Sequence, residues 1–397
     1  MSTSNRLPGV DGLRAIAALW VVLFHVTALS HARFPQIPGL DVFLKSGSTG
    51  VSLFLVLSGF CLFLPFAAGR TARFKSGEFF RRRFRRLAPA YYTSLILSLL
   101  VAVLTATSVG LPPLGVADGV WQLVTHATLT HSLFPDTFYA LNGAYWSLGL
   151  EWQLYLGLPL LVLGIRRFGL ARTLTFAVAC NVVYRLALGA AIQRGLVVAG
   201  SPLAEYVLPN QLFGRWAEFA FGMLAADLYA SQRLQRAARY VPVMLGGMLV
   251  LAPLSILASQ SQLGHIVYGV LFGTLLCVVL ISNNIVARVA AWRPLVALGT
   301  MSYSLYLVHQ PVLQTLSAWF DTYSPTTPPT TMFWIMLLGA VPGILVLAWL
   351  LFLSVERRTL GPSAATALQP RLNLGLRWPG VPVRAGARQS ALAEIAD

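Results

Sequence analysis

The chain has 397 residues, of which 56% are hydrophobic and only 11% charged, and its net charge is +16. Soluble globular proteins carry roughly 25% charged residues, so this composition excludes an ordinary soluble fold and indicates a membrane protein. The positive charge does not predict nucleic-acid binding, because the basic residues lie in short segments between apolar stretches rather than on one solvated face.

Ten apolar stretches of bilayer-spanning length predict an all-α, polytopic transmembrane bundle of about ten helices, formed by residues 1–356. We expect the spans at approximately 12–30, 49–68, 88–107, 142–163, 170–189, 209–229, 240–257, 264–283, 295–316 and 331–354. Most of the 29 Lys and Arg residues then share the side of the two termini, which the positive-inside rule makes cytoplasmic. The tail, 357–397, is predicted to be a disordered cytoplasmic extension because it is rich in Gly, Pro, Ala and Arg.

The first stretch, DGLRAIAALWVVLFHVTALS, carries two ionisable residues, Arg14 and His25. Eleven residues at 100° each return to within roughly 20° of the starting direction, so both side chains share a helix face about 16 Å apart. Asp11 precedes Arg14 by three residues and is predicted to pair with it. Ionisable groups inside a membrane usually mark a substrate path, a proton relay or a catalytic centre. The alternative is a snorkelling Arg14 and a His25 that only packs.

Five arginines between Arg81 and Arg86 come just before the third span. Arg83 and Arg86, three residues apart, share one helix face, and guanidinium groups bind phosphate in a bidentate manner. This cluster predicts a binding site for a phosphorylated cytoplasmic donor. A plain topology anchor is the competing interpretation.

Two later spans each carry a polar stripe. Ser147, Glu151 and Tyr155 in the fourth span follow one another at intervals of four residues, and Tyr306 and His309 share a face of the ninth. A carboxylate at the depth of Glu151 must pair with a cation or remain protonated. A purely structural pairing is the alternative.

Three ionisable side chains, His25, Glu151 and His309, are predicted at a similar depth in the membrane, counted along their helices. A common depth suggests one polar centre, although it does not establish that the three helices are neighbours.

The remaining polar residues suggest no further chemistry. Arg215 and Glu218, three residues apart in the sixth span, are predicted to form a structural ion pair. His126 and His131 lie in the non-spanning segment 108–141, without metal-ligand spacing, and are expected at the surface. The three cysteines are far apart and predict neither disulfides nor a metal site.

Five motifs, in this order, resemble the acyltransferase-3 family of integral membrane acyltransferases. They are DGLRAIAALWVVLFH, VSLFLVLSGF, RRFRRLAPAYY, YWSLGLEWQLY and MSYSLYLVHQP. The resemblance implies ten core transmembrane helices in a bacterial inner membrane. It also implies transfer of an acyl group, commonly acetyl, to a hydroxyl of a cell-envelope or secreted glycan or a glycosylated small molecule. The implied donor is cytoplasmic acyl-CoA, acting as a co-substrate and not as a permanently bound cofactor.

The resemblance also implies roles for particular residues. His25 is the expected general base, and Glu151 is an active-site carboxylate that we expect to orient its imidazole. Residues expected to bind the donor or the acceptor are Arg14, Arg83, Arg86, Ser147, Tyr155, Tyr306 and His309. No metal site is predicted. The competing hypothesis is a proton-coupled transporter, or an exporter of a lipid-linked glycan, with His25, Glu151 and His309 as a proton relay.

Overall fold

The computed structural model describes residues 7–69, 74–108, 116–258, 261–281 and 283–359, all within one compact unit, Asn5–Thr359. Over these ranges the chain is helical and contains no β-strand, as the sequence predicts. The predicted disordered tail lies outside the described residues, except for its first three positions.

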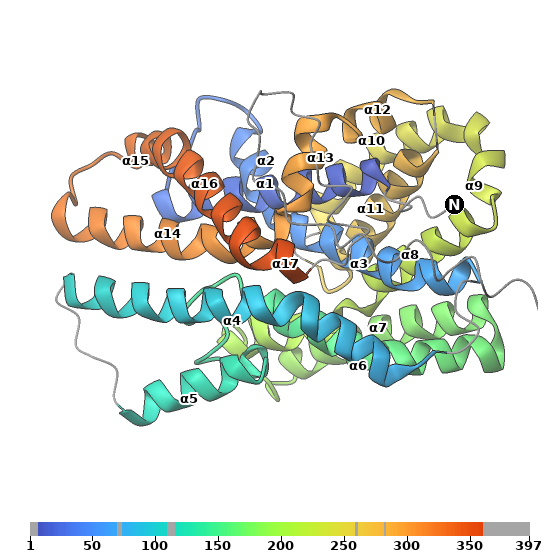
Figure 1. Ribbon diagram of the computed structural model, residues 1–397, viewed down its shortest axis with the longest axis horizontal. Helices are drawn as coiled ribbons and strands as arrows, with labels where there is room; N and C mark the ends of the chain where they lie inside the picture. Colours follow the sequence, from blue (N-terminus) through green and yellow to red (C-terminus); the bar gives the residue numbers. More distant parts are fainter. Residues whose placement is uncertain (1–6, 70–73, 109–115, 259–260, 282, 360–397) are drawn as a thin grey trace, which may run out of the picture. The chain divides into compact units, whose positions relative to one another are not determined.

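The helices follow one another around a bundle of long spans joined by short connecting helices (Figure 1). In chain order they are α1 (Pro8–Ser30), α2 (Leu40–Ser46), α3 (Gly50–Ala67), α4 (Ser76–Ser108), α5 (Val116–Ala127), α6 (Trp146–Phe168), α7 (Leu170–Gln193), α8 (Leu212–Ala230), α9 (Arg233–Arg236), α10 (Val241–Ala258), α11 (Gly264–Leu280), α12 (Ile285–Ala290), α13 (Arg293–Thr300), α14 (Ser302–Tyr323), α15 (Pro329–Ile335), α16 (Val341–Leu351) and α17 (Arg357–Thr359). Helix α1 packs against α3, α13 and α14, while α3 packs against α8, and α14 against α4 and α16.

Seven helical segments of the described chain are long and apolar enough to cross a membrane, and each matches a predicted span. The other three predicted spans are also helical. Helix α11 is apolar but short, and α8 carries several charged residues. The span expected at 295–316 is divided at Met301 into α13 and α14, which the apolar pattern alone did not reveal. The protein is therefore a multi-pass membrane protein with a helical core.

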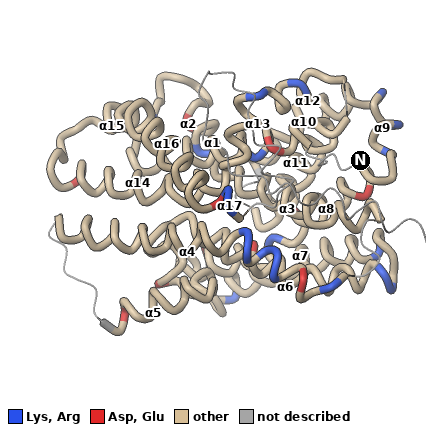
Figure 2. The backbone as a smooth tube through the Cα atoms, in the orientation of Figure 1, with Lys and Arg blue, Asp and Glu red and all other residues tan. Residues whose placement is uncertain are grey.

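Apolar side chains cover the outside of the bundle. Leu249 and Leu257 on α10 are 78% and 77% exposed, which suits contact with lipid and not with water. Figure 2 shows most Lys and Arg residues gathered around α9, α12, α17 and the first turns of α4. We call this the basic end. At the opposite end the hydroxyl of Tyr323, on the last turn of α14, donates to the carbonyl of Ser108, the last residue of α4.

The crossing of α3 and α8 depends on two glycines. A Cβ at Gly59 would lie 2.1 Å from the carbonyl oxygen of Phe219, and one at Gly222 would lie 1.9 Å from that of Val56. Small residues at such a crossing let the two backbones approach closely, which is how helices gain contact where lipid supplies no hydrophobic driving force. The close crossing fixes the face of α3 that contributes to the site.

A proline shapes α14 at the centre of the bundle. Pro311 has no N–H, so the carbonyl oxygen of Leu307, four residues earlier, loses its partner within the helix. Two side chains replace it: the Asn142 amide donates to this oxygen at 2.8 Å and the Ser94 hydroxyl at 3.2 Å. These bonds tie α14 to α4 and to the loop before α6.

Candidate active site

Two histidines meet where α1 and α14 pack together. The Nδ1 atom of His25 lies 3.3 Å from Nε2 of His309, and the ring centroids are 5.0 Å apart. His309 is completely buried, whereas His25 is half-buried. The structure therefore brings together two of the three ionisable residues that the sequence places at a common depth.

The backbone determines which nitrogen of each ring carries hydrogen. His309 Nδ1 lies 2.8 Å from the carbonyl oxygen of Tyr306, which only accepts, so Nδ1 donates and Nε2 is left as an acceptor. His25 Nδ1 faces that acceptor and also the carbonyl oxygen of Val21, at 2.9 Å, so it too carries hydrogen. The remaining nitrogen of His25, Nε2, then has a free lone pair, as a general base requires.

Tyr306 extends the polar centre towards α6. Its hydroxyl and that of Ser147 are 2.6 Å apart, and its ring lies 5.5 Å from the ring of His309. Phe54 of α3 packs edge-on against the ring of Tyr306, with the ring centroids 5.8 Å apart. Tyr306 and Ser147, both predicted as site residues, thus meet beside the histidine pair.

Glu151 lies one helical turn beyond Ser147 on α6, in a separate group. Its carboxylate accepts hydrogen bonds from the Ser58 hydroxyl at 3.1 Å and the Tyr155 hydroxyl at 2.5 Å. The predicted stripe from Glu151 to Tyr155 is confirmed. The expected contact between Glu151 and His25 is not formed, because the ring that bonds His25 Nδ1 is that of His309.

Two arginines, Arg14 and Arg83, add positive charge near Glu151. Arg14 pairs with Asp11 at 3.4 Å, as predicted, and its second guanidinium nitrogen donates to the Cys61 sulfur at 3.3 Å. Arg83 lies over the ring of Phe79, 5.8 Å from the ring centroid. Both arginines are close enough to Glu151 to interact with it electrostatically, which compensates a carboxylate inside the membrane.

A pocket of about 430 Å³, including its open mouth, lies between α4, α6 and α14. Its charged lining residues are Arg83 and Glu151, and the rest of its wall is apolar and aromatic, with four tyrosines: Tyr91, Tyr92, Tyr155 and Tyr303. The exposed ring of Phe84 lies on α4 beside Arg83. A site with a cation, a long apolar wall and a carboxylate suits an extended ligand that is anionic at one end. His25 and Arg86 do not line this pocket.

Glu356, near the end of the last span, is a buried carboxylate that the sequence reasoning missed. The hydroxyl of Ser304 donates to it at 2.6 Å, and it interacts electrostatically with Arg86 and Arg14. It is only 3% exposed. The available signal was a single Glu at the boundary of an apolar stretch, FLSVERR, where the two following arginines suggested an ordinary loop.

The expectation that His126 and His131 lie at the surface is wrong. Both are fully buried, and their rings stack with centroids 4.4 Å apart and planes 8° from parallel. The chain after α5 folds back against the last turn of that helix and covers both rings, a tertiary contact without a local sequence signal. Burial, with a smaller effect from His126, lowers the pKa of His131 to about 4.

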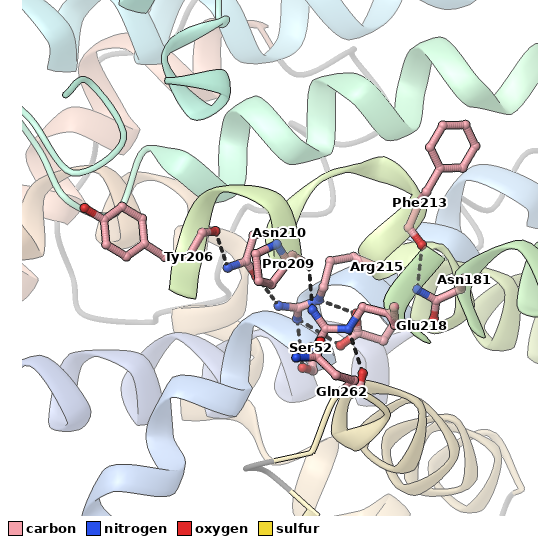
Figure 3. Close-up of polar contacts among 10 residues, drawn as sticks. Ser52, Asn181, Tyr206, Pro209, Asn210, Phe213, Arg215, Glu218 and Gln262 are labelled. Carbon is pink, nitrogen blue, oxygen red and sulfur yellow. Dashed lines mark hydrogen bonds and ion pairs between the residues drawn. The ribbon is translucent and has the colours of Figure 1, made fainter. Parts of the chain in front are cut away.

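The predicted pair of Arg215 and Glu218 forms, and it is fully buried (Figure 3). Arg215 donates to both carboxylate oxygens of Glu218, at 2.5 and 2.9 Å, and also to Asn210 and Ser52. The pair joins α8 to α3 and to the loop before α8. Such a network suits the structural role expected of it.

Comparison with known proteins identifies the family of the chain. Residues 7–353 match the model of a family described as an acyltransferase domain. The chain belongs to the acyltransferase-3 family. No solved structure matches it.

Three of the curated relatives of the chain are bacterial proteins from Staphylococcus, Bacillus and Listeria. It is 26% identical over 350 residues to the O-acetyltransferase OatA of Staphylococcus aureus, covering 81% of this chain and 53% of the relative. It is 27% identical to the putative peptidoglycan O-acetyltransferase YrhL of Bacillus subtilis, covering 77% and 48%, and 25% identical to the peptidoglycan O-acetyltransferase OatA of Listeria monocytogenes, covering 77% and 49%. The chain thus spans about half the length of the curated relatives it matches.

Proposed function

We propose that this chain is a membrane O-acyltransferase of a bacterial inner membrane. It moves an acyl group, most simply acetyl, from cytoplasmic acyl-CoA to a hydroxyl of a cell-envelope glycan, and His25 acts as the general base. The observation that carries the proposal is the buried histidine pair, because it leaves His25 Nε2 as a free base inside a membrane bundle of this family.

The reaction needs one proton acceptor and one proton donor. His25 Nε2 takes the proton of the acceptor hydroxyl as its oxygen attacks the thioester carbonyl. The C–O bond forms, the C–S bond breaks, and the imidazolium returns the proton to the departing thiolate. His309 Nε2, which accepts from His25 Nδ1, stabilises the imidazolium in between. The neighbouring hydroxyl of Tyr306 is our candidate donor to the developing oxyanion.

The donor is assigned to the pocket beside α4. Arg83 at its wall, with Arg86 one turn further along α4, supplies guanidinium groups for the phosphates of coenzyme A. The apolar wall suits the pantetheine arm, and Glu151 in the same wall lies one helical turn from Ser147, which bonds Tyr306 beside the histidine pair. This assignment requires the basic end to be cytoplasmic, in agreement with the positive-inside rule.

The acceptor is proposed from the relatives. Those in Bacillus and Listeria are named as peptidoglycan O-acetyltransferases, so a glycan of the cell wall is the first acceptor to test. It would approach His25 from the end of the bundle opposite the arginines, so that the donor and the acceptor meet from two sides.

The test uses the full chain in proteoliposomes with acetyl-CoA and soluble peptidoglycan fragments, and mass spectrometry detects the addition of acetyl groups. Arg83→Gln should raise the KM for acetyl-CoA at least tenfold, because a charge-assisted contact is lost. Arg82→Gln is the matched control, since Arg82 is exposed and pairs only with Glu78 in the described structure. His25→Gln should reduce kcat by at least a hundredfold. If His25→Gln keeps the wild-type kcat, the assignment of His25 as the general base is wrong. If glycan is translocated without acetylation, the acyltransferase proposal is wrong and a transporter is favoured.

A further inference from the structure

Four aromatic side chains cluster at the end of the bundle opposite the arginines. The rings of Tyr139 and Tyr206 lie 4.7 Å apart at 48°, and Tyr139 is 46% exposed. Phe138 is fully buried behind them, 4.8 Å from Tyr139 and 5.1 Å from Tyr206. Phe138 also stacks on Trp146, at 5.6 Å and 15°. We call these four residues the aromatic platform.

The aromatic platform adjoins the proposed reaction centre. Trp146 immediately precedes Ser147, whose hydroxyl bonds that of Tyr306, and it packs against the small cluster that holds Tyr306 and Val21. Val21 is also the residue whose carbonyl oxygen bonds the ring of His25. The Tyr139 hydroxyl is near enough to that of Tyr306 to interact with it electrostatically. The platform and the histidine pair therefore both adjoin Tyr306, the platform through the Tyr139 hydroxyl and the pair through the ring of His309.

The short helical segment Leu203–Val207, which carries Tyr206, is held from inside the protein. The carbonyl oxygen of Tyr206 accepts a hydrogen bond from the Asn210 side-chain amide at 2.8 Å, and the side-chain oxygen of Asn210 accepts one from Arg215 at 2.8 Å (Figure 3). Arg215 is in turn fixed by Glu218. Burying two charges is costly unless their hydrogen bonds are satisfied. One of the bonds that satisfies Arg215 goes to Asn210, which in turn bonds the backbone of Tyr206. The backbone that carries Tyr206 is thus held in place, which lowers the entropy cost of binding at this residue.

We propose that Tyr139 and Tyr206 form the acceptor subsite, where they stack on the apolar face of a sugar ring and direct one of its hydroxyl groups towards His25. This inference rests on the proposed function for the identity of the acceptor. Aromatic rings with polar edges suit a pyranose, which has C–H groups on its faces and hydroxyls around its rim. Burial, together with the neighbouring Tyr206, raises the pKa of Tyr139 to about 12, so its hydroxyl stays protonated and can donate.

A sugar fits this site better than a lipid tail. An acyl chain needs a wholly apolar surface, whereas Tyr139 and Tyr206 each add a hydroxyl group that can hydrogen-bond to a sugar. Another aromatic pair at the same end, Trp319 and Tyr323 on the last turns of α14, provides the comparison. Those rings lie away from the histidine pair and suit the membrane interface, where Trp and Tyr are enriched.

The first experiment titrates a soluble peptidoglycan oligosaccharide at saturating acetyl-CoA, using the full chain in detergent micelles. Tyr139→Ala or Tyr206→Ala should raise the KM for the oligosaccharide about two- to tenfold, because each removes one aromatic contact. The KM for acetyl-CoA should stay at its wild-type value. Tyr139→Phe and Tyr206→Phe keep the stacking surface and should recover most of the affinity. Tyr323→Ala, the matched control, should leave the KM for the oligosaccharide unchanged.

The second experiment measures binding without the reaction. In the His25→Gln protein, the oligosaccharide should change the intrinsic tryptophan fluorescence, and this change should disappear when Tyr139→Ala is added. The subsite is refuted if the KM for the oligosaccharide does not change, if the KM for acetyl-CoA rises equally, or if Tyr323→Ala has the same effect. Glycan binding without any acyl transfer would instead refute the proposed function while supporting the subsite.

Discussion

Replacing His309 by Phe tests how the histidine pair works. The substitution keeps a ring in the buried space and removes the nitrogen that accepts from His25 Nδ1. The carbonyl oxygen of Val21 still accepts from that Nδ1 at 2.9 Å, so His25 keeps the tautomer that leaves Nε2 free. What is lost is one hydrogen bond to the imidazolium that forms during the reaction. A bond of this kind contributes about 1.5 to 3 kcal/mol, so kcat should fall about 10- to 150-fold.

The assay is the kcat for acetyl transfer from acetyl-CoA to glycan fragments, with thermal unfolding in detergent as a check on folding. His309→Gln offers an amide oxygen as an alternative acceptor and should recover part of the rate, while His25→Phe should be far more damaging than His309→Phe. Two results would refute the reasoning. If the kcat of His309→Phe is within twofold of wild type, His309 does not stabilise the imidazolium of His25. If the kcat of His309→Phe falls as far as that of His25→Phe, His309 is itself the base.

Three further predictions concern stability and the donor. Because the folded protein disfavours a charged His131, the unfolded chain takes the proton first as the pH falls below 6.5; acidification from pH 7.5 to 4.5 should lower the free energy of unfolding by about 2 to 3 kcal/mol through this residue, and His131→Phe should remove that part of the pH dependence in denaturant titrations. Gly222→Ala should destabilise the protein by about 1 to 3 kcal/mol through overpacking, whereas Gly246→Ala, which meets open space, should not; equal unfolding temperatures for the two variants would contradict the helix crossing. Glu356→Ala removes the buried charge beside Arg86 and should raise the KM for acetyl-CoA about tenfold, and an unchanged donor titration would exclude that role.

The sequence predicted those features that depend on position along one helix. Arg14 pairs with Asp11 because both lie on the first turns of α1, and Tyr155 reaches Glu151 because four residues make about one turn. Counting residues from the helix ends also placed His25 and His309 at one depth, and they are in contact.

Depth does not determine which helices are neighbours or which way their side chains face. Glu151 was therefore expected beside His25, although the packing of α6 directs it to Ser58 of α3 instead. Glu356 was missed for a related reason, because its burial depends on the contact of the last span with Ser304 of α14. Folding back of the segment after α5, which buries His131, is equally a tertiary effect.

The carbonyl oxygen of Leu307 has a consequence for how the protein can move. If α14 shifted alone, this buried oxygen would lose Asn142 and Ser94 and stay without a partner, at a cost of several kcal/mol. Helix α14, helix α4 and the loop that carries Asn142 must therefore move together. Any movement that admits or releases reactants must therefore occur between other helices of the bundle. The position of His309 relative to the loop of Asn142 stays the same throughout a turnover.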